Sequence, residues 1–172
     1  MADKVAAVPK KEFSFPDALV QAYRTNERMN QYLIENLAAE AWRAPTLDRK
    51  GRDIAAIFAH MHNVRVMSLK AAKSAHVPEQ LDRLKCTPEI TTKAFAESAR
   101  ALSATLMASS NASGAVKGFK PDVVGFLGYL IAHDAHHRGQ ISMLARQAGH
   151  ALTQKAMFGM WEWGSRSKEA GA

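Results

Sequence analysis

Apolar residues recur every three to four positions along four long stretches of this chain, the spacing that places them on one face of an α-helix. No stretch of useful length alternates apolar and polar residues as a half-buried β-strand does. With 172 residues, 47% of them hydrophobic, the chain has enough apolar material for one core. The sequence therefore predicts an all-α single domain over residues 1–172, with a flexible N-terminal tail over residues 1–12.

Capping and helix-breaking residues set the expected limits of the helices. The first is expected from Ser14 to about Ala41, the second from Gly51–Asp53 to just before Ser74, the third from Thr87 into "SSNASG", and the fourth from Pro121 to near Gly149. Fully extended, the segment from His76 to Thr87 would span about 40 Å, roughly the length of a 25-residue helix. We therefore expect a four-helix bundle in which a long crossover leaves the second and third helices parallel. A short C-terminal helical segment over "QKAMFGMWEWGSRSK" is expected to cover one end of the bundle.

Composition disfavours several classes of function. The first fifteen residues hold no apolar run of signal-peptide length, and no stretch reaches the roughly 20 apolar residues that span a bilayer. The formal net charge is +7, but Lys and Arg are scattered instead of clustered with aromatic residues. Cys86 is the only cysteine, so no internal disulfide can form. We expect a cytoplasmic protein that binds neither nucleic acid nor membrane.

The segment "IAHDAHHRGQISMLA", residues 131–145, places three histidines and two charged residues in an otherwise apolar helix. On a helical wheel His133 and His137 fall inside the apolar stripe, about one turn apart, whereas His136 points away from it. Two imidazoles at this spacing can bind one metal ion, which would satisfy polar groups that are costly to bury. The pair therefore predicts a metal site on the fourth helix.

A third ligand is expected from a neighbouring helix, because two histidines on one helix make a weak site. The second helix offers "AHMHN", in which His60 and His62 lie about equally far from the centre of the apolar stripe, on opposite sides. Periodicity alone leaves both residues open. Isolated histidines are more often hydrogen-bonded structural residues, which is the expectation for His76, His136 and His150.

Other polar residues are expected close to this site. Asp134 faces the apolar stripe and Arg65 lies near the centre of the apolar face of the second helix. An ion pair of Asp134 with Arg65 or with Arg138 is the favoured interpretation, since it would neutralise both charges. The alternative is that Asp134 accepts a hydrogen bond from a ligand imidazole and fixes its tautomer. Tyr129 and Gln140 flank the histidines and either line a pocket or lie at the boundary of the core.

The order of these motifs, "IFAHMHNVR" on the second helix and "HDAHHRGQI" on the fourth, resembles the DinB superfamily of four-helix-bundle metalloproteins over nearly the whole chain. The resemblance implies a divalent-metal site formed by His60, His133 and His137. It favours His60 over His62, so His62 is expected to be a hydrogen-bonded structural residue like the other isolated histidines. It also implies parallel second and third helices and a homodimer. Zinc or nickel is the expected ion, with iron or manganese as alternatives.

Three imidazoles without a carboxylate or thiolate leave coordination positions open, which is typical of catalytic metal sites. The resemblance also brings in thiol-dependent transferases and isomerases that use low-molecular-weight thiols. We therefore expect a metal-dependent transferase or hydrolase in which an activated thiol attacks an electrophilic small-molecule substrate. The alternative is a non-catalytic metal-binding stress or interaction protein. The sequence identifies no catalytic residue beyond the expected ligands.

Overall fold

The computed structural model describes residues 12–47 and 49–171. These residues form α1 (Phe15–Asn36), the 3-10 turn η1 (Ala39–Ala41), α2 (Ile54–Ala72), α3 (Pro88–Asn111), α4 (Val123–Gln147), α5 (Gln154–Gly159) and α6 (Trp163–Gly171). Within these ranges there is no β-strand beyond one isolated bridge, so the all-α prediction is confirmed. The tail expected over residues 1–12 lies outside the described residues, except for Glu12. No helix in the described ranges has both the length and the apolar character needed to cross a membrane.

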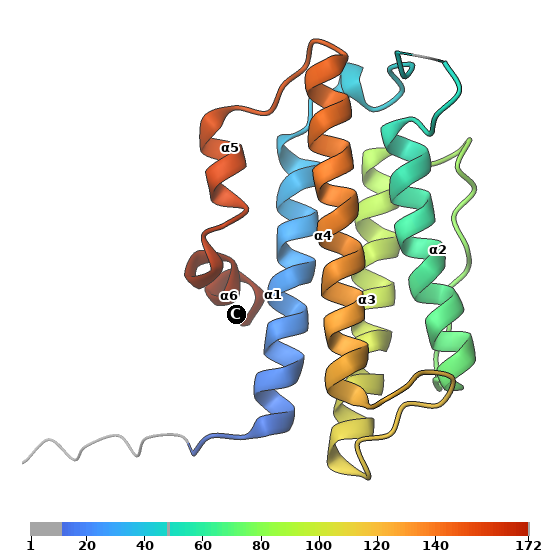
Figure 1. Ribbon diagram of the computed structural model, residues 1–172, viewed down its shortest axis with the longest axis vertical. Helices are drawn as coiled ribbons and strands as arrows, with labels where there is room; N and C mark the ends of the chain where they lie inside the picture. Colours follow the sequence, from blue (N-terminus) through green and yellow to red (C-terminus); the bar gives the residue numbers. More distant parts are fainter. Residues whose placement is uncertain (1–11, 48, 172) are drawn as a thin grey trace, which may run out of the picture.

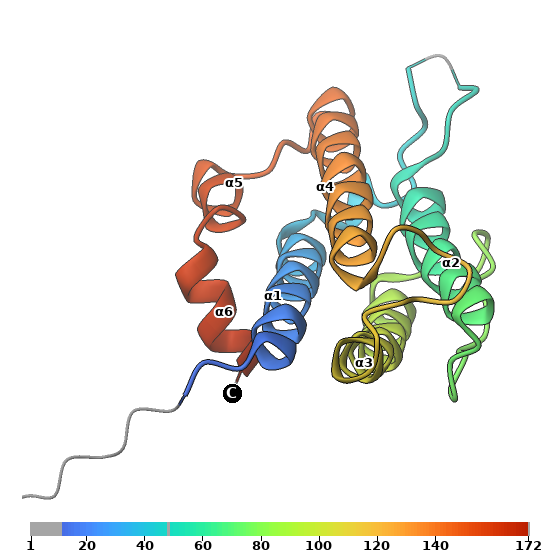
Figure 2. The same ribbon diagram turned by 60° about the horizontal axis from the view of Figure 1, so that its bottom comes forward.

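The four long helices lie side by side (Figure 1, Figure 2). In Figure 1, α1 and α4 run upward while α2 and α3 both run downward, and the segment between α2 and α3 returns along the length of the helices. α1 and α2 each pack against both α3 and α4. Residues on the inner faces of α2 and α4 are therefore neighbours, as a site shared by these two helices requires.

The helix starts follow from their capping residues. The N-cap side chains each accept a hydrogen bond from a backbone N–H of the first turn; for the four long helices they are Ser14, Asp53, Thr87 and Asp122. α4 begins at Val123, two residues after the expected Pro121, because the Asp122 carboxylate accepts from the amides of Val124 and Gly125.

The first helix ends at Asn36, and the expectation that it continues to Ala41 is wrong. Leu37 takes an extended conformation, and the chain then turns through η1 to bury Ala41 and Trp42. The Trp42 ring stacks on Phe58 at a centroid distance of 5.0 Å, and its Nε1 donates to the Cys86 carbonyl at 2.8 Å. Burial of this large side chain outweighs the few further hydrogen bonds of a longer helix.

The C-terminal segment forms two helices and does not cover an end of the molecule as expected. Figure 1 shows α5 and α6 beside α1. Glu169 of α6 accepts from Arg28 of α1 at 2.6 Å and from Arg166 at 2.8 Å, and Gln21 donates to the carbonyl of Ser167 at 2.8 Å. Polar contacts with α1 thus hold α6 against the flank of the molecule.

The interior contains two apolar clusters. One is built around Trp42, Phe58 and Phe95, and the other around Tyr23, Leu102 and Phe126. Each of the four long helices also carries buried polar side chains at positions between its residues in the two clusters: Asn26, Glu27, Asn30, Arg65, Ser98 and Asp134. This group is called the polar layer below.

Candidate metal centre

His60, His133 and His137 are brought together by α2 and α4. Each offers one ring nitrogen, and these nitrogens all lie within 4.8 Å of one another. The ring centroids of His133 and His137, one turn apart on α4, are separated by 4.5 Å, and His60 lies 5.4 Å and 4.9 Å from them. Among the residues that the structure describes, no carboxylate or thiolate belongs to this cluster.

The surroundings of His60 and His137 favour the neutral form of these two imidazoles. His137 is buried, and burial lowers its pKa to about 4 even though the hydrogen bond that it donates to Gln140 acts in the opposite direction. His60 is half-buried, and burial together with the positive charge of Arg52 lowers its pKa as well. Neutral imidazoles have the free electron pair that a metal ion needs, so the donor set fits a divalent cation.

Two neighbours flank the imidazoles of α4. The Nδ1 atom of His137 lies 2.7 Å from Oε1 of Gln140. An amide oxygen can only accept, so Nδ1 carries the proton and Nε2 is left as the free ligand atom. The ring of Tyr129 stacks on His133 at a centroid distance of 6.0 Å. Tyr129 and Gln140, which are predicted either to line a pocket or to lie at the boundary of the core, therefore lie beside the cluster.

The other histidines are not part of the cluster, although the ring centroid of His136 lies 5.0 Å from that of His137. His62 is fully buried on a different side of α2, where its Nε2 donates to the Glu79 carbonyl at 2.9 Å. His136 is exposed, and His76 is exposed and contacts Glu97 at 2.9 Å. The structure thus places His60, and not His62, next to the two histidines of α4.

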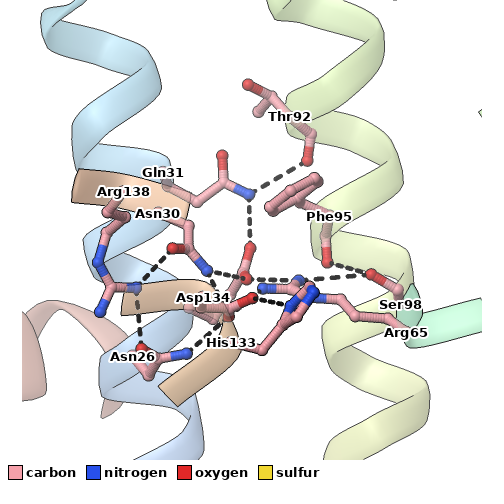
Figure 3. Close-up of polar contacts among 11 residues, drawn as sticks. Asn26, Asn30, Gln31, Arg65, Thr92, Phe95, Ser98, His133, Asp134 and Arg138 are labelled. Atoms are coloured by element: carbon pink, nitrogen blue, oxygen red, sulfur yellow. Dashed lines mark hydrogen bonds and ion pairs between the residues drawn. The ribbon is translucent and has the colours of Figure 1, made fainter. Parts of the chain in front are cut away.

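Asp134 joins the cluster to the polar layer, as Figure 3 shows. Its Oδ2 atom accepts from Arg65 at 2.8 Å, from Asn26 at 2.7 Å and from Asn30 at 2.8 Å. Its Oδ1 atom lies 3.9 Å from Nδ1 of His133, too far for a hydrogen bond but close enough for electrostatic attraction. Burial alone would raise the pKa of Asp134, but the Arg65 charge and these contacts hold it well below its ordinary value.

Of the two cations considered for Asp134, Arg65 makes the ion pair. Arg65 also contacts Glu27 at 2.7 Å. Arg138 instead donates from Nη1 to the amide oxygens of Asn26 and Asn30, at 2.9 Å and 2.6 Å. The two asparagines therefore connect Arg138 to Asp134 through their amide groups.

Sequence reasoning missed the contribution of α1 to the polar layer. Asn26, Glu27 and Asn30 are all buried. The available signal was the run "TNERMN", which places polar residues between Tyr23 and Leu33 on the otherwise apolar face of α1. A buried arginine and aspartate on other helices require such partners.

A hollow of about 510 Å³ adjoins the cluster. Its lining includes Gln140, the hydrogen-bond partner of His137, together with Ile57, Met143 and Leu144. Arg52, which lies close enough to lower the pKa of His60, also lines it. The hollow has the size of a small-molecule pocket and carries a positive charge at its wall.

In a comparison with known families, the model of the DinB family matches residues 1–162. No curated protein and no solved structure matched the chain.

Proposed function

Because the chain belongs to the DinB family, we propose that it binds one divalent metal ion through His60, His133 and His137 and acts as a metal-dependent enzyme. The proposed reaction is the transfer of a low-molecular-weight thiol to an electrophilic small molecule. One observation carries the proposal: three imidazoles from two helices converge with no carboxylate or thiolate from residues 12–47 or 49–171 beside them, so coordination positions stay open for reactants. Zinc or nickel suits these ligands best, with iron or manganese as alternatives.

The bound ion would supply Lewis acidity, lowering the pKa of a thiol or water at the open position and polarising the acceptor. Side chains next to the three histidines orient the ligand imidazoles for this role. Gln140 fixes the tautomer of His137, and the Asp134 carboxylate, 3.9 Å from Nδ1 of His133, would favour a proton on that nitrogen and leave Nε2 free for the ion. Arg65, through its ion pair, keeps the Asp134 carboxylate charged and in position.

The reacting thiol must come from a small molecule. Cys86 is the only cysteine of the chain. It is buried, its Sγ lies 2.9 Å from the Thr91 hydroxyl, and burial raises the pKa of its thiol. A buried thiol with a raised pKa is a poor nucleophile.

The hollow beside His137 is the proposed substrate site. Met143 and Leu144 offer apolar contact, while Arg52 offers a positive charge. This combination favours a substrate or thiol that carries an anionic group next to an apolar part. A homodimer and a cytoplasmic location complete the proposal.

Metal analysis of protein purified without a nickel column tests the first step. About one equivalent of one divalent metal is expected per chain. His60→Ala and His137→Ala should each lose stoichiometric binding, because two imidazoles hold the ion weakly. His136→Ala, an exposed histidine next to His137, is the matched control and should retain it. Retention of metal by both ligand variants would overturn the proposed site.

Turnover separates the enzyme from a metal-binding stress or interaction protein. The metal-loaded protein is incubated with electrophiles and with a panel of low-molecular-weight thiols, and thioether formation is followed by mass spectrometry. Catalysed product that disappears in His137→Ala supports the enzyme. Full metal binding without product from any thiol favours the non-catalytic alternative.

A further inference from the structure

A second groove lies on the side of α4 that faces away from His133 and His137. It has a volume of about 520 Å³ and runs between α4, α1 and the C-terminal helices. Ala135 and Ser142 contribute to its floor and lie about half a turn around α4 from the metal ligands. The groove therefore lies on a different side of α4 from the metal ligands, although Gly139 and Met143 line both the groove and the proposed substrate hollow.

The walls of this groove are mostly apolar. They include four methionines, Met29, Met143, Met157 and Met160, together with Leu152 and Trp161. Methionine side chains are flexible and polarisable, so they adapt to apolar ligands of differing shape. Trp161 is 82% exposed at the edge, where its ring is free to cover a bound molecule.

The charges on the groove have one sign. Arg138 and Arg146 line it, and none of the described residues that line it is acidic. Arg146 is exposed, and its side chain makes no hydrogen bond or ion pair with the described residues. A groove with apolar walls and only positive charges is complementary to a molecule with an apolar body and an anionic group.

Arg138 is positioned to bind such an anionic group. Its Nη1 atom is fixed by the amide oxygens of Asn26 and Asn30, at 2.9 Å and 2.6 Å. Within residues 12–47 and 49–171, its Nε and Nη2 atoms have no hydrogen-bond acceptor, and its fixed partners are neutral amides. A guanidinium held in place with unused donors loses little freedom when it binds a carboxylate.

We propose that this groove binds a small amphipathic carboxylate, with its carboxylate on Arg138 and its apolar part against the methionines and Trp161. Arg146, about 12 Å further along α4 by helical rise, adds a positive potential over the same groove. The site requires no metal, so this proposal stands or fails separately from the proposed function.

Titration of the metal-free full-length protein with decanoate tests the proposal, with calorimetry as the readout. Saturable binding with one site per chain is expected. Decanol, which has the same chain without the charge, should bind about tenfold more weakly, and decyltrimethylammonium should not bind. Equal binding of all three compounds would show non-specific association with an apolar surface and would overturn the proposal. Absence of decanoate binding would overturn it as well.

Two variants locate the site. Ala135→Trp should fill the groove and weaken decanoate binding about tenfold or more without touching Arg138. Ala104→Trp is its control, because Ala104 is also an exposed helical alanine but lies on α3, away from the groove. Unchanged decanoate affinity in Ala135→Trp would contradict the assignment.

The charge is tested by Arg138→Met, which is expected to weaken decanoate about tenfold and leave decanol unchanged. Because Arg138 also binds two asparagines, Arg146→Met serves as a second variant that removes a charge without removing a hydrogen bond within the described chain. Arg100→Met, on the exposed side of α3, is its control. If decanoate dissociates a dimer instead of occupying a one-site groove, the groove is an interface between two copies and the proposal is wrong.

Discussion

Arg65 carries a full charge in the middle of the molecule. Its side chain is 1% exposed, and its guanidinium lies 4.4 Å above the Phe95 ring and within 2.8 Å of both Glu27 and Asp134. Burial by itself lowers the pKa of Arg65, but the two carboxylates outweigh it and raise that pKa well above its ordinary value. The guanidinium is therefore charged at every pH at which the protein is folded, and the two carboxylates depend on it.

Arg65→Met is expected to lower the free energy of unfolding by about 3–5 kcal/mol, because it leaves two buried carboxylates without a cation. Arg28→Met is the matched control. Arg28 also contacts two carboxylates, those of Glu35 and Glu169, but its ion pairs are partly exposed. The control should lose about 1 kcal/mol or less. Urea denaturation measures both, and equal losses would contradict a special role for Arg65.

The pKa of His137 makes the stability of the metal-free protein depend on pH. It is lowered to about 4 in the folded state, against about 6.5 in an unfolded chain. Between these values the unfolded chain binds a proton that the folded protein does not, so this contribution to stability is present above about pH 6.5 and is lost as the pH falls toward 4.

Thermal unfolding of the metal-free protein between pH 7 and pH 4.5 measures this effect. His137→Gln cannot bind the proton and should show a shallower fall in stability than the unaltered protein. The comparison between the two proteins is needed because Glu27 also titrates abnormally, its pKa being raised by burial. Parallel curves would show that His137 does not contribute.

The histidine pair of α4 was predictable because both residues belong to one helix and their spacing fixes their relative direction. His60 could not be chosen over His62 from periodicity, since both lie at the edges of the apolar stripe. The structure separates them by their partners: His60 faces two imidazoles, whereas His62 faces the carbonyl of Glu79. Such contacts depend on where other segments pass, which the pattern of one helix does not contain.

At the scale of elements, one asparagine side chain fixes Leu81 in the middle of the segment between α2 and α3. Asn63 of α2 accepts from the Leu81 amide at 2.8 Å and donates to the Leu81 carbonyl at 3.0 Å. One side chain thereby satisfies both backbone groups of a residue that lacks regular secondary structure. His62 adds a bond to Glu79 two residues earlier.

Asn63→Ala should release this segment while leaving the helices intact. We expect faster amide exchange at Leu81, faster proteolysis between residues 76 and 86, and a loss of stability of about 1–3 kcal/mol for two backbone groups left unpaired. Asn36→Ala is the control, because the Asn36 side chain is exposed and only contacts the Tyr32 carbonyl of its own helix. Equal protection of Leu81 in both variants would refute the role of Asn63.

Helix starts were easier to predict than helix ends. Ser14, Asp53 and Thr87 act as caps through contacts with residues three positions ahead, so local sequence contains the whole interaction. The end of α1 instead depends on Trp42 reaching Phe58 and the Cys86 carbonyl, which are distant in sequence. Tertiary burial overrode local helix propensity there.

At the scale of the whole molecule, the polar layer relates the two candidate sites. Arg138 in the groove binds Asn26 and Asn30, these bind Asp134, and Asp134 lies against His133 of the metal cluster. Arg65 supplies the buried positive charge that compensates the Asp134 carboxylate in this network. The two apolar clusters that flank the network exclude water from it. The layer therefore sets the relative positions of α1, α2 and α4, on which both sites depend.

The homodimer expected from family membership is tested by sedimentation at micromolar concentration, where we expect a species of twice 18.8 kDa. Phe158 is 62% exposed on the C-terminal segment, and an exposed aromatic side chain of this kind favours a protein interface. Phe158→Ser should weaken the dimer. It should leave decanoate binding unchanged, because Phe158 does not line the groove. A single 18.8 kDa species for the unaltered protein would contradict the dimer, and a dimer unaffected by Phe158→Ser would place the interface on another face.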